Sequence, residues 1–367
     1  MKNELTYWYT LTFLRGITLR RKNEIFVNCY KLGYSVINLF DDSTIWDEIG
    51  LSEAEKVILS SAQAELTRNA FAVEKYLSQG YEIIPFCSKE YPEPLKKNLK
   101  LLSPTIIFIK GNKELLATDA IAIVGSRNAD DVSLSFTSNV AHNCAAMGKT
   151  VVSGFAKGVD RMALDAALEA GGKSIIVLPQ GIATFSSGFR QYYQAILQGR
   201  VLVLSTFHPE MPWRVENAME RNTYVYGLAQ SIYVARSDSK GGTWEGVQSG
   251  MKRGCKIYVR KADSSEKCAN NILIQQGAKA VDQYGIELSE VNAAVQQQSM
   301  DLDDRIKDVL TSGALSSKSV IASLHLDWTD ANMKKHLRSL SFVEEYKNKS
   351  GTIMFQCKGV GNPSLFD

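Results

Sequence analysis

Residues 120–172 read AIAIVGSRNADDVSLSFTSNVAHNCAAMGKTVVSGFAKGVDRMALDAALEAGG, and this stretch decides the fold. Two short runs rich in β-branched residues, Ile121–Val124 and Thr150–Val152, each precede a longer amphipathic segment, Val132–Met147 and Asp160–Ala170. Apolar strands separated by segments long enough for crossover helices are typical of βαβ units. The stretch therefore predicts a mainly parallel sheet covered by helices on both faces, an α/β fold.

The same alternation extends over residues 81–285, which we expect to form one core domain. Its other strand-like runs are Ile106–Ile109, Ser174–Leu178, Val201–Leu204, Ser231–Ala235 and Lys256–Val259. Residues 286–300 are polar and rich in glutamine, so they are interpreted as a linker. In residues 301–367, three helical faces precede two β-rich runs joined by Asn348–Gly351, an order that predicts a winged helix.

Residues 1–80 have apolar side chains at helical spacing and predict a small helical domain, similar to a SAM or helix-hairpin-helix domain. Gly16 lies just before the basic residues Arg20, Arg21 and Lys22. One interpretation is a glycine turn whose amides contact a phosphate. The favoured alternative is a charged helix start that faces water, because most charge runs do so.

Composition excludes several classes of protein. The 367 residues are 45% hydrophobic and 22% charged, with a formal net charge of +3, as in an ordinary globular protein of two or three domains. The six cysteines include no CxxC pair, which argues against a zinc site and predicts free thiols in a reducing compartment. Without a signal-peptide pattern or an apolar run of transmembrane length, we expect a cytoplasmic protein with no membrane partner.

Three strand ends carry small, amide-rich sequences where an open parallel sheet binds its ligands. These are Gly125-Ser126-Arg127, the segment from Ser153-Gly154 to Lys157-Gly158, and Lys240-Gly241. Glycine lets the backbone approach a phosphate, a helix N-terminus favours the anion, and Arg or Lys adds charge. Glycines that only permit tight packing are the alternative, but three such turns together favour phosphate binding.

No catalytic or cofactor motif is present. The sequence lacks both GxGxxG after the first strand and GxxxxGK[ST], which argues against NAD dehydrogenases and P-loop enzymes. No serine or cysteine nucleophile accompanies a histidine, and His142 and His208 are interpreted as structural. Asp160 opens a helix and is interpreted as its N-cap. We therefore expect no enzyme activity, no catalytic residue, no metal and no cofactor.

Several motifs in a fixed order resemble the DNA-processing protein A (DprA/Smf) family. They are IAIVGSR, SGFAKGVD, and Gly171-Gly172, preceded by Tyr91-Pro92 and by Ile109-Lys110-Gly111-Asn112. The resemblance covers nearly the whole chain. It implies an extended Rossmann-like core that binds single-stranded DNA, forms homodimers and helps load a RecA-like recombinase during natural transformation (competence).

The resemblance also implies which residues contact DNA. From the first two strand ends these are Gly125, Ser126, Arg127, Ser153, Gly154, Lys157 and Gly158. The family's Arg-Asn-Arg element is matched by Arg221 and Asn222, with Thr223 in place of the second arginine, and its Ser-Gly-Ser-x-x-Thr element by a segment that starts at Lys240-Gly241. Leu164 stands where the family commonly has histidine. These departures leave open a divergent branch that senses DNA or nucleotide in phage defence.

Two alternatives to DNA binding remain. Lys240–Glu245 (KGGTWE) also resembles an element of Lonely-Guy phosphoribohydrolases, which implies a nucleotide-binding enzyme or sensor. In those enzymes the glutamate follows the threonine by three residues, whereas Glu245 follows Thr243 by two. The other alternative, ranked last, is a protein scaffold with a vestigial pocket.

Aromatic side chains near the loops and basic side chains in the terminal domain are further candidates for contact with DNA. Four aromatics fall in or near the same loops and could either stack bases or belong to the core: Phe155, Phe207, Trp213 and Trp244. In the terminal domain, Lys334, Lys335 and Arg338 suggest duplex binding, but the domain is charge-neutral, and a protein contact is an equal alternative.

Overall fold

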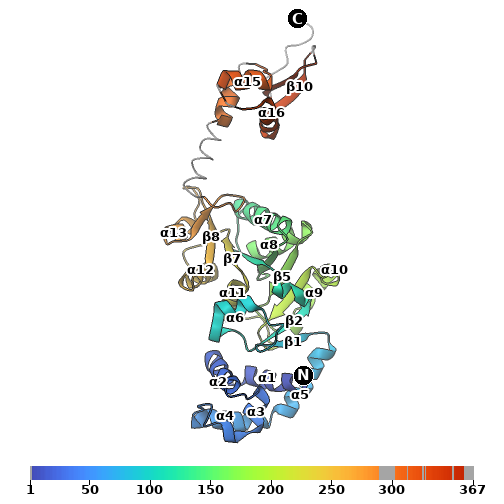
Figure 1. Cartoon of the computed structure of the whole chain (residues 1–367), viewed down its shortest axis with the longest axis vertical. Coiled ribbons are helices and arrows are strands. Elements are labelled where there is room, and N and C mark those ends of the chain that lie inside the picture. The colour runs from blue at the N-terminus through green and yellow to red at the C-terminus, as the bar shows by residue number, and fades with distance from the viewer. Residues whose placement is uncertain are drawn as a thin grey trace. The chain divides into compact units, whose positions relative to one another are not determined.

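The computed structural model (Figure 1) describes residues 2–288, 302–311, 313–324, 326, 328–348 and 351–358. The chain divides into two compact units, Met1–Glu287 and Leu288–Asp367. Along the described chain, no helix combines the length and apolar character needed to cross a membrane.

The first unit begins with a helical bundle, as expected for residues 1–80. Its helices are α1 (Lys2–Phe13), α2 (Leu19–Lys31), α3 (Val36–Asp41), α4 (Glu53–Gln63) and α5 (Leu66–Ser78), with a 3-10 turn at Ser43–Ile45. Ser35 and Ser52 form capping boxes that start α3 and α4. Trp8 and Leu11, which follow the 3.6-residue apolar pattern, are fully buried at the centre of the bundle, whereas Val57 and Phe71 of the same pattern are exposed.

Of the three basic residues after Gly16, Arg21 and Lys22 are engaged within the bundle, whereas the Arg20 side chain is exposed. Gly16 has a positive φ of 86° in the turn between α1 and α2. Arg20 pairs with Glu24, and the Nε of Arg21 lies 2.7 Å from a carboxylate oxygen of Glu55. The Lys22 ammonium donates to the carbonyl of Thr12 (2.6 Å), and burial lowers its pKa to about 8.

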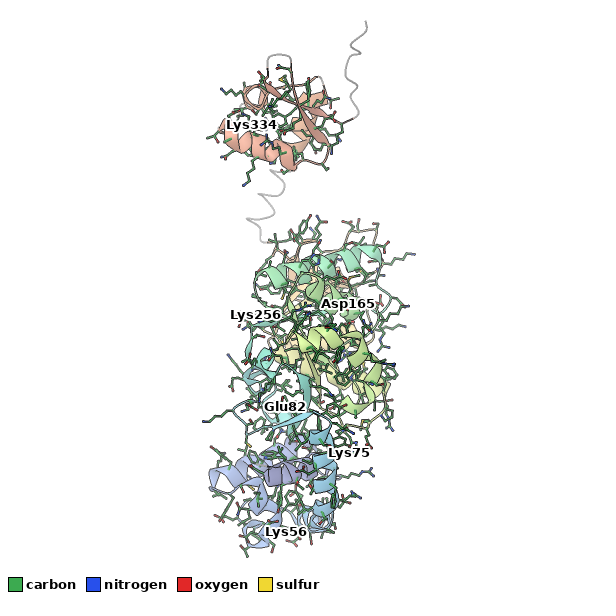
Figure 2. All side chains as sticks on the ribbon, turned by 90° about the vertical axis from the view of Figure 1, so that its right-hand side faces the viewer. Lys56, Lys75, Glu82, Asp165, Lys256 and Lys334 are labelled. Carbon is green, nitrogen blue, oxygen red and sulfur yellow. The ribbon has the colours of Figure 1, made fainter. Side chains whose placement is uncertain are left out.

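The bundle packs directly on the α/β core. Helix α1 contacts β1 (Glu82–Pro85) and β2 (Ile106–Gly111), and buried side chains of bundle and sheet form one continuous cluster. Lys75 of α5 forms an ion pair with Glu210 of the core. Lys75 lies on the side of the bundle next to the core, whereas Lys56 lies at its far end (Figure 2).

A nine-stranded sheet forms the core, in the order β1-β2-β6-β5-β4-β3-β7-β8-β9. The seven strands from β6 to β9 are parallel, and β1 and β2 run antiparallel at one edge. The remaining strands are β3 (Ala120–Val124), β4 (Thr150–Ser153), β5 (Lys173–Val177), β6 (Val201–Ser205), β7 (Ser231–Val234), β8 (Lys256–Arg260) and β9 (Lys279–Val281). The predicted α/β, mainly parallel, Rossmann-like sheet is confirmed.

Helices cover both faces of this sheet. Ile121 and Ile123 pack in one cluster with α7 (Asp131–Ala146) and α8 (Val159–Glu169). Ala120 and Ala122 face the other cluster, with α6 (Glu93–Leu99), α11 (Val215–Leu228), α12 (Gly242–Lys252) and α13 (Asn270–Gln275). The short helices α9 (Ser186–Gln191) and α10 (Tyr193–Leu197) lead to β6. Alternate residues of β3 thus supply the two cores.

Strand β3 occupies the position where the chain changes direction across the sheet. From β3 the chain proceeds through β4, β5 and β6 on one side, and then returns to place β7, β8 and β9 on the other. Such a topological switch opens a crevice at the carboxyl ends of the two central strands, which here are β3 and β7.

The second unit holds a helix over residues 302–311, α15 (Ser317–Leu324), α16 (Asp330–Ser339) and a hairpin of β10 (Val343–Lys347) and β11 (Ile353–Cys357). Thr329 caps α16, and Phe355 is fully buried among the helices. This order is the one expected of a winged helix, which stays a prediction. Residues 289–300 of the expected linker lie outside the described residues, while Glu287 still pairs with Val281 at the sheet edge.

Candidate nucleic-acid interface

A cleft of about 400 Å³ lies at the topological switch point, beside α11 and the start of α12. Sequence reasoning placed eleven residues at this site, and seven of them line the cleft: Gly125, Ser126, Arg127, Arg221, Asn222, Lys240 and Gly241. They come from two loops and one helix, and the first and last of them are more than 100 residues apart in the sequence. The parallel sheet therefore brings the predicted segments together.

The loop after β3 is held by backbone contacts. The Ser126 amide donates to the carbonyl of Arg236 (3.0 Å), and the Ser126 hydroxyl accepts from the amide of Asn128 (3.2 Å). Gly158 has a φ of 85°, and a Cβ there would lie 2.6 Å from the carbonyl oxygens of Ser126 and Arg127. Glycine at 158 thus lets the loop after β4 approach the loop after β3.

Two cations and a helix N-terminus make the cleft attractive to anions. Arg127 and Lys240 are exposed, and neither has an ion-pair partner in the described part of the chain. Helix α12 follows Gly241, which has a φ of 92° and no side chain to cap the first amides. The amides and dipole of an eleven-residue helix therefore add to the positive charge at this point.

Arg221 lines the cleft but has a structural environment. Its side chain is almost entirely buried, and Nη1 donates to the carbonyls of Gly154 and Val177, the latter at 2.9 Å. Its Nη2 lies 3.7 Å from the carboxylate of Asp160. Burial lowers the pKa of Arg221 and raises that of Asp160, although each charge partly offsets the effect on the other. This guanidinium joins the ends of β4 and β5.

Asp160 corrects one sequence interpretation. Gly158, rather than Asp160, occupies the N-cap position of α8. The Asp160 carboxylate instead faces Arg221 at the floor of the cleft. Sequence reasoning missed this pairing because the two residues are brought together only by the parallel sheet.

The other four predicted residues lie behind or beside the cleft. The Ser153 hydroxyl is buried and donates to the carbonyl of Ile123 (2.9 Å). Gly154 is packed so closely that a Cβ would overlap the Arg221 guanidinium. Lys157 is exposed but is not part of the cleft lining, and Gly158 supports the neighbouring loop as described above.

Among the four aromatic candidates, Trp213 has the geometry to contact a ligand. Its side chain is 47% exposed, and its ring lies 5.9 Å from the guanidinium carbon of Arg127. Phe207 is buried, and Trp244 packs against the core. Phe155 packs edge-to-face on Phe185, with 4.8 Å between ring centroids. Trp213 and Phe155 line a small hollow of about 70 Å³ next to the main cleft.

The phosphoribohydrolase-like element, residues 240–245, lies only partly in the cleft. Glu245 is exposed on α12 and does not line the cleft, although Thr243 does. Among the described residues, no group of three or more His, Cys, Asp or Glu side chains could hold a metal ion. Arg127 and Lys240 in the lining suit the cleft to bind an anion.

Comparison with known proteins places the core in a family. The model of the family described as DNA recombination-mediator protein A matches residues 82–292. The DNA processing protein DprA of Bacillus subtilis (strain 168) is 28% identical over 209 residues, which are 56% of this chain and 70% of that protein. DprA of Streptococcus pneumoniae (strain ATCC BAA-255 / R6) is 30% identical over 182 residues, 49% of this chain and 64% of that protein.

A solved structure supports the fold. The X-ray structure of DprA from Streptococcus pneumoniae aligns with a TM-score of 0.58 at 24% identity, and covers 76% of this chain and 94% of that one. At this identity the likeness concerns the fold, which is the sheet and helices described above. Because the family model covers more than half of the residues, the chain belongs to the DNA recombination-mediator protein A family.

Proposed function

We propose that this protein binds single-stranded DNA across the cleft at the ends of β3 and β7. One observation carries the proposal: an exposed arginine, Arg127, lies against an exposed tryptophan, Trp213, next to the uncapped start of α12. Strand-tracking proteins combine cations for the phosphates with aromatic rings on which bases stack. Bases in a duplex are already stacked on one another, so Trp213 favours the single strand.

The residues take distinct parts in this binding. Arg127 and Lys240 contact successive phosphates, and the first amides of α12 hold one of them. A base stacks on Trp213, and no base edge needs to be read, so binding tolerates any sequence. Arg221 and Asp160 hold the loops in place from beneath.

The family also supports a role beyond strand binding. Because its members are described as recombination mediators, we infer that the chain helps to load a RecA-like recombinase on single-stranded DNA, as a homodimer and in the cytoplasm. In this account the protein carries out no catalytic step of its own and needs no cofactor.

The nucleotide-hydrolase alternative is not favoured. Glu245, the residue that would have to act on the nucleotide, lies outside the cleft lining. Incubation with nucleoside monophosphates should therefore release no free base, and Glu245→Gln should change nothing. Release of base that this substitution abolishes would reverse the assignment.

The direct test is binding of a labelled oligo-dT, compared with a duplex of equal length, by fluorescence anisotropy. We expect the single strand to bind more tightly and its affinity to fall steeply with salt. Equal binding of both forms, or of neither, would contradict the proposal.

A further inference from the structure

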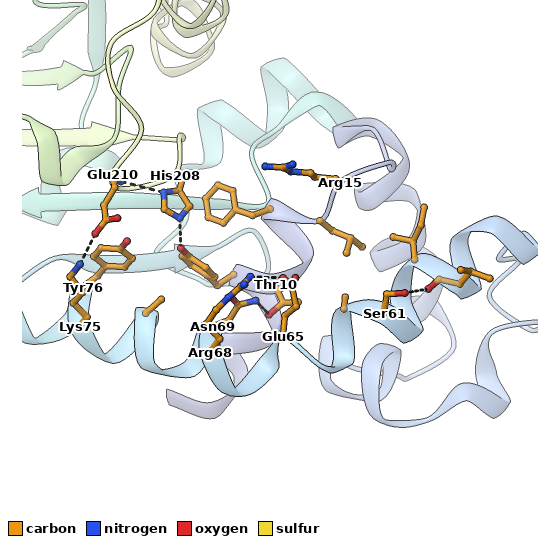
Figure 3. Close-up of a pocket in the computed structure, with 17 residues that line it drawn as sticks. Thr10, Arg15, Ser61, Glu65, Arg68, Asn69, Lys75, Tyr76, His208 and Glu210 are labelled. Carbon is orange, nitrogen blue, oxygen red and sulfur yellow. Dashed lines mark hydrogen bonds and ion pairs between the residues drawn. The ribbon is translucent and has the colours of Figure 1, made fainter.

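A second cavity of the first unit lies away from the DNA cleft, between the helical bundle and the core. It has a volume of about 810 Å³, and its walls come from α1, α4, α5 and the loop after β6 (Figure 3). It shares no lining residue with the cleft at the strand ends. Pockets for small ligands commonly measure about 300–1,000 Å³, so its size is that of a ligand site.

One end of the cavity is a neutral aromatic wall. The rings of Phe13 and His208 meet edge-to-face with 5.1 Å between centroids. The Glu210 amide donates to Nδ1 of His208 (3.3 Å), and burial lowers the pKa of this histidine. The proton of the neutral ring therefore lies on Nε2, which donates to the hydroxyl of Tyr9 at 2.8 Å. This wall offers planar surface without charge.

The rim carries one uncompensated positive charge. Two of its cations, Lys75 and Arg68, form ion pairs with Glu210 and Glu65 of the same rim. Arg15 is exposed at the end of α1 and has no ion-pair partner among the described residues. Figure 3 shows Arg15 above the cavity, across from Glu65 and Arg68. A ligand with one acidic group would complement this charge.

Asn69 on the floor presents a hydrogen-bond acceptor. The Asn69 side chain is only 8% exposed, and its Nδ2 donates to the hydroxyl of Thr10 (3.0 Å). That hydroxyl is in turn oriented by donation to the carbonyl of Thr6 (2.8 Å). Among the described residues, the hydrogen bond of the Asn69 side chain is made by its Nδ2 and not by its Oδ1. It is left to accept a hydrogen from a ligand N–H.

We propose that this cavity is a binding site for a nucleoside monophosphate. The heteroaromatic base would pack on Phe13 and His208 and give an N–H to Asn69, and the phosphate would pair with Arg15. These three features, a planar ring, a donor and a single acidic group, are what the wall, floor and rim require. The site is separate from the DNA cleft, so the proposal does not depend on strand binding.

The test is isothermal titration of the full chain with dAMP, dCMP, dGMP and dTMP. It is run in an Arg127→Ala/Lys240→Ala background, so that the DNA cleft does not contribute. We expect at least one nucleotide to bind and Arg15→Ala to weaken it about tenfold. Ala72→Trp, which fills the cavity from α5, should abolish binding. Arg20→Ala is the matched control, since Arg20 lies in the same bundle but outside the lining.

The titrations have outcomes that overturn the proposal and outcomes that identify the ligand. Absence of binding by all four nucleotides at millimolar concentration overturns the proposal, as does binding that Arg15→Ala and Ala72→Trp leave unchanged in folded protein. If a 5′-phosphorylated trinucleotide displaces the mononucleotide and its unphosphorylated form does not, the ligand is the end of a strand. If neither displaces it, the ligand is a free nucleotide. Both results support the site, and neither depends on the outcome of the oligo-dT experiment.

Discussion

The guanidinium of Arg127 lies 5.9 Å from the ring centroid of Trp213, within the range of a cation–π contact. Arg127 follows β3, whereas Trp213 belongs to the loop between β6 and α11, and both side chains are largely exposed. The contact places a phosphate-binding cation beside a base-stacking ring. Trp213 lies in the loop after β6, and the same loop contains His208, which lines the bundle cavity.

Trp213→Ala should weaken the binding of oligo-dT. Stacking of one base on an aromatic side chain contributes about 1–3 kcal/mol, so we expect affinity to fall by about five- to 150-fold, measured by anisotropy. Phe71→Ala is the control, because Phe71 is an exposed aromatic on α5 outside the cleft. Equal losses for both variants would show that Trp213 has no special role.

Gly158→Ala should damage both stability and DNA binding. The substitution places a Cβ 2.6 Å from the carbonyl oxygens of Ser126 and Arg127, at a φ of 85°. Gly254→Ala introduces a similar φ, 76°, but meets nothing within 4 Å. Both variants carry backbone strain of about 1–3 kcal/mol. In urea unfolding, Gly158→Ala should lose at least about 1 kcal/mol more than Gly254→Ala, and indistinguishable losses would contradict the close approach.

Arg221→Met should lower the free energy of unfolding by about 3–5 kcal/mol, because it leaves the buried Asp160 without its partner. The carbonyls of Gly154 and Val177 also lose their donor. Urea unfolding of the variant measures the effect. Unchanged stability together with a loss of DNA binding would instead make Arg221 a direct ligand of the phosphate.

Acid should destabilise the helical bundle through Glu55. Its hydrogen bonds with Arg21 and Ser52 lower its pKa from 4.5 to about 2. A lowered pKa in the folded state stabilises the protein above pH 4.5, and this contribution is lost as the pH falls toward 2. We expect Glu55→Gln to remove an acid-dependent contribution on the order of 2 kcal/mol, since solvent partly screens the pair.

The control for the acid experiment is Glu53→Gln. Glu53 lies in the first turn of the same helix, but its side chain is 87% exposed. Unfolding by guanidinium chloride at pH 2–6 would be followed by circular dichroism. An identical pH profile for wild type and Glu55→Gln would rule out the coupling to Arg21.

The sequence predicted the central strands well, because buried parallel strands are short apolar runs bounded by glycine turns. It missed the edge strands Glu82–Pro85 and Lys279–Val281. These are three or four residues long, and Pro85 cannot donate to a ladder, a feature that disfavours a strand assignment.

The site residues could be predicted only in part. Gly125, Arg127 and Lys240 follow strands whose ends must meet, so sheet topology alone brings them together. Whether a side chain is buried cannot be predicted from topology in the same way. Ser153 and Arg221 belong to the expected motifs, yet the Ser153 hydroxyl and Nη1 of Arg221 donate to backbone carbonyls. Whether a polar side chain faces the cleft or the core depends on packing between helix α11 and the sheet, which no local pattern encodes.

The bundle cavity could not be predicted from the sequence either, because it also depends on packing between distant segments. His208 and Tyr9 are hydrogen-bonded at 2.8 Å but lie 199 positions apart in the sequence, so the sequence alone shows only an isolated histidine. Only the docking of α1 against the loop after β6 brings the two rings together.

The measurement that tests the central claim most directly is the salt dependence of oligo-dT binding by the double variant Arg127→Ala/Lys240→Ala. The matched control is Lys173→Ala/Lys256→Ala. It removes two exposed lysines at the first residues of β5 and β8, at the ends of the strands opposite to the cleft. For single strands the slope of log K against log salt falls by about 0.7 for each lost phosphate contact. We expect the slope to become shallower by about 1.4 in the first variant and to stay unchanged in the control. Equal slopes in both variants would show that single-stranded DNA does not bind at this cleft.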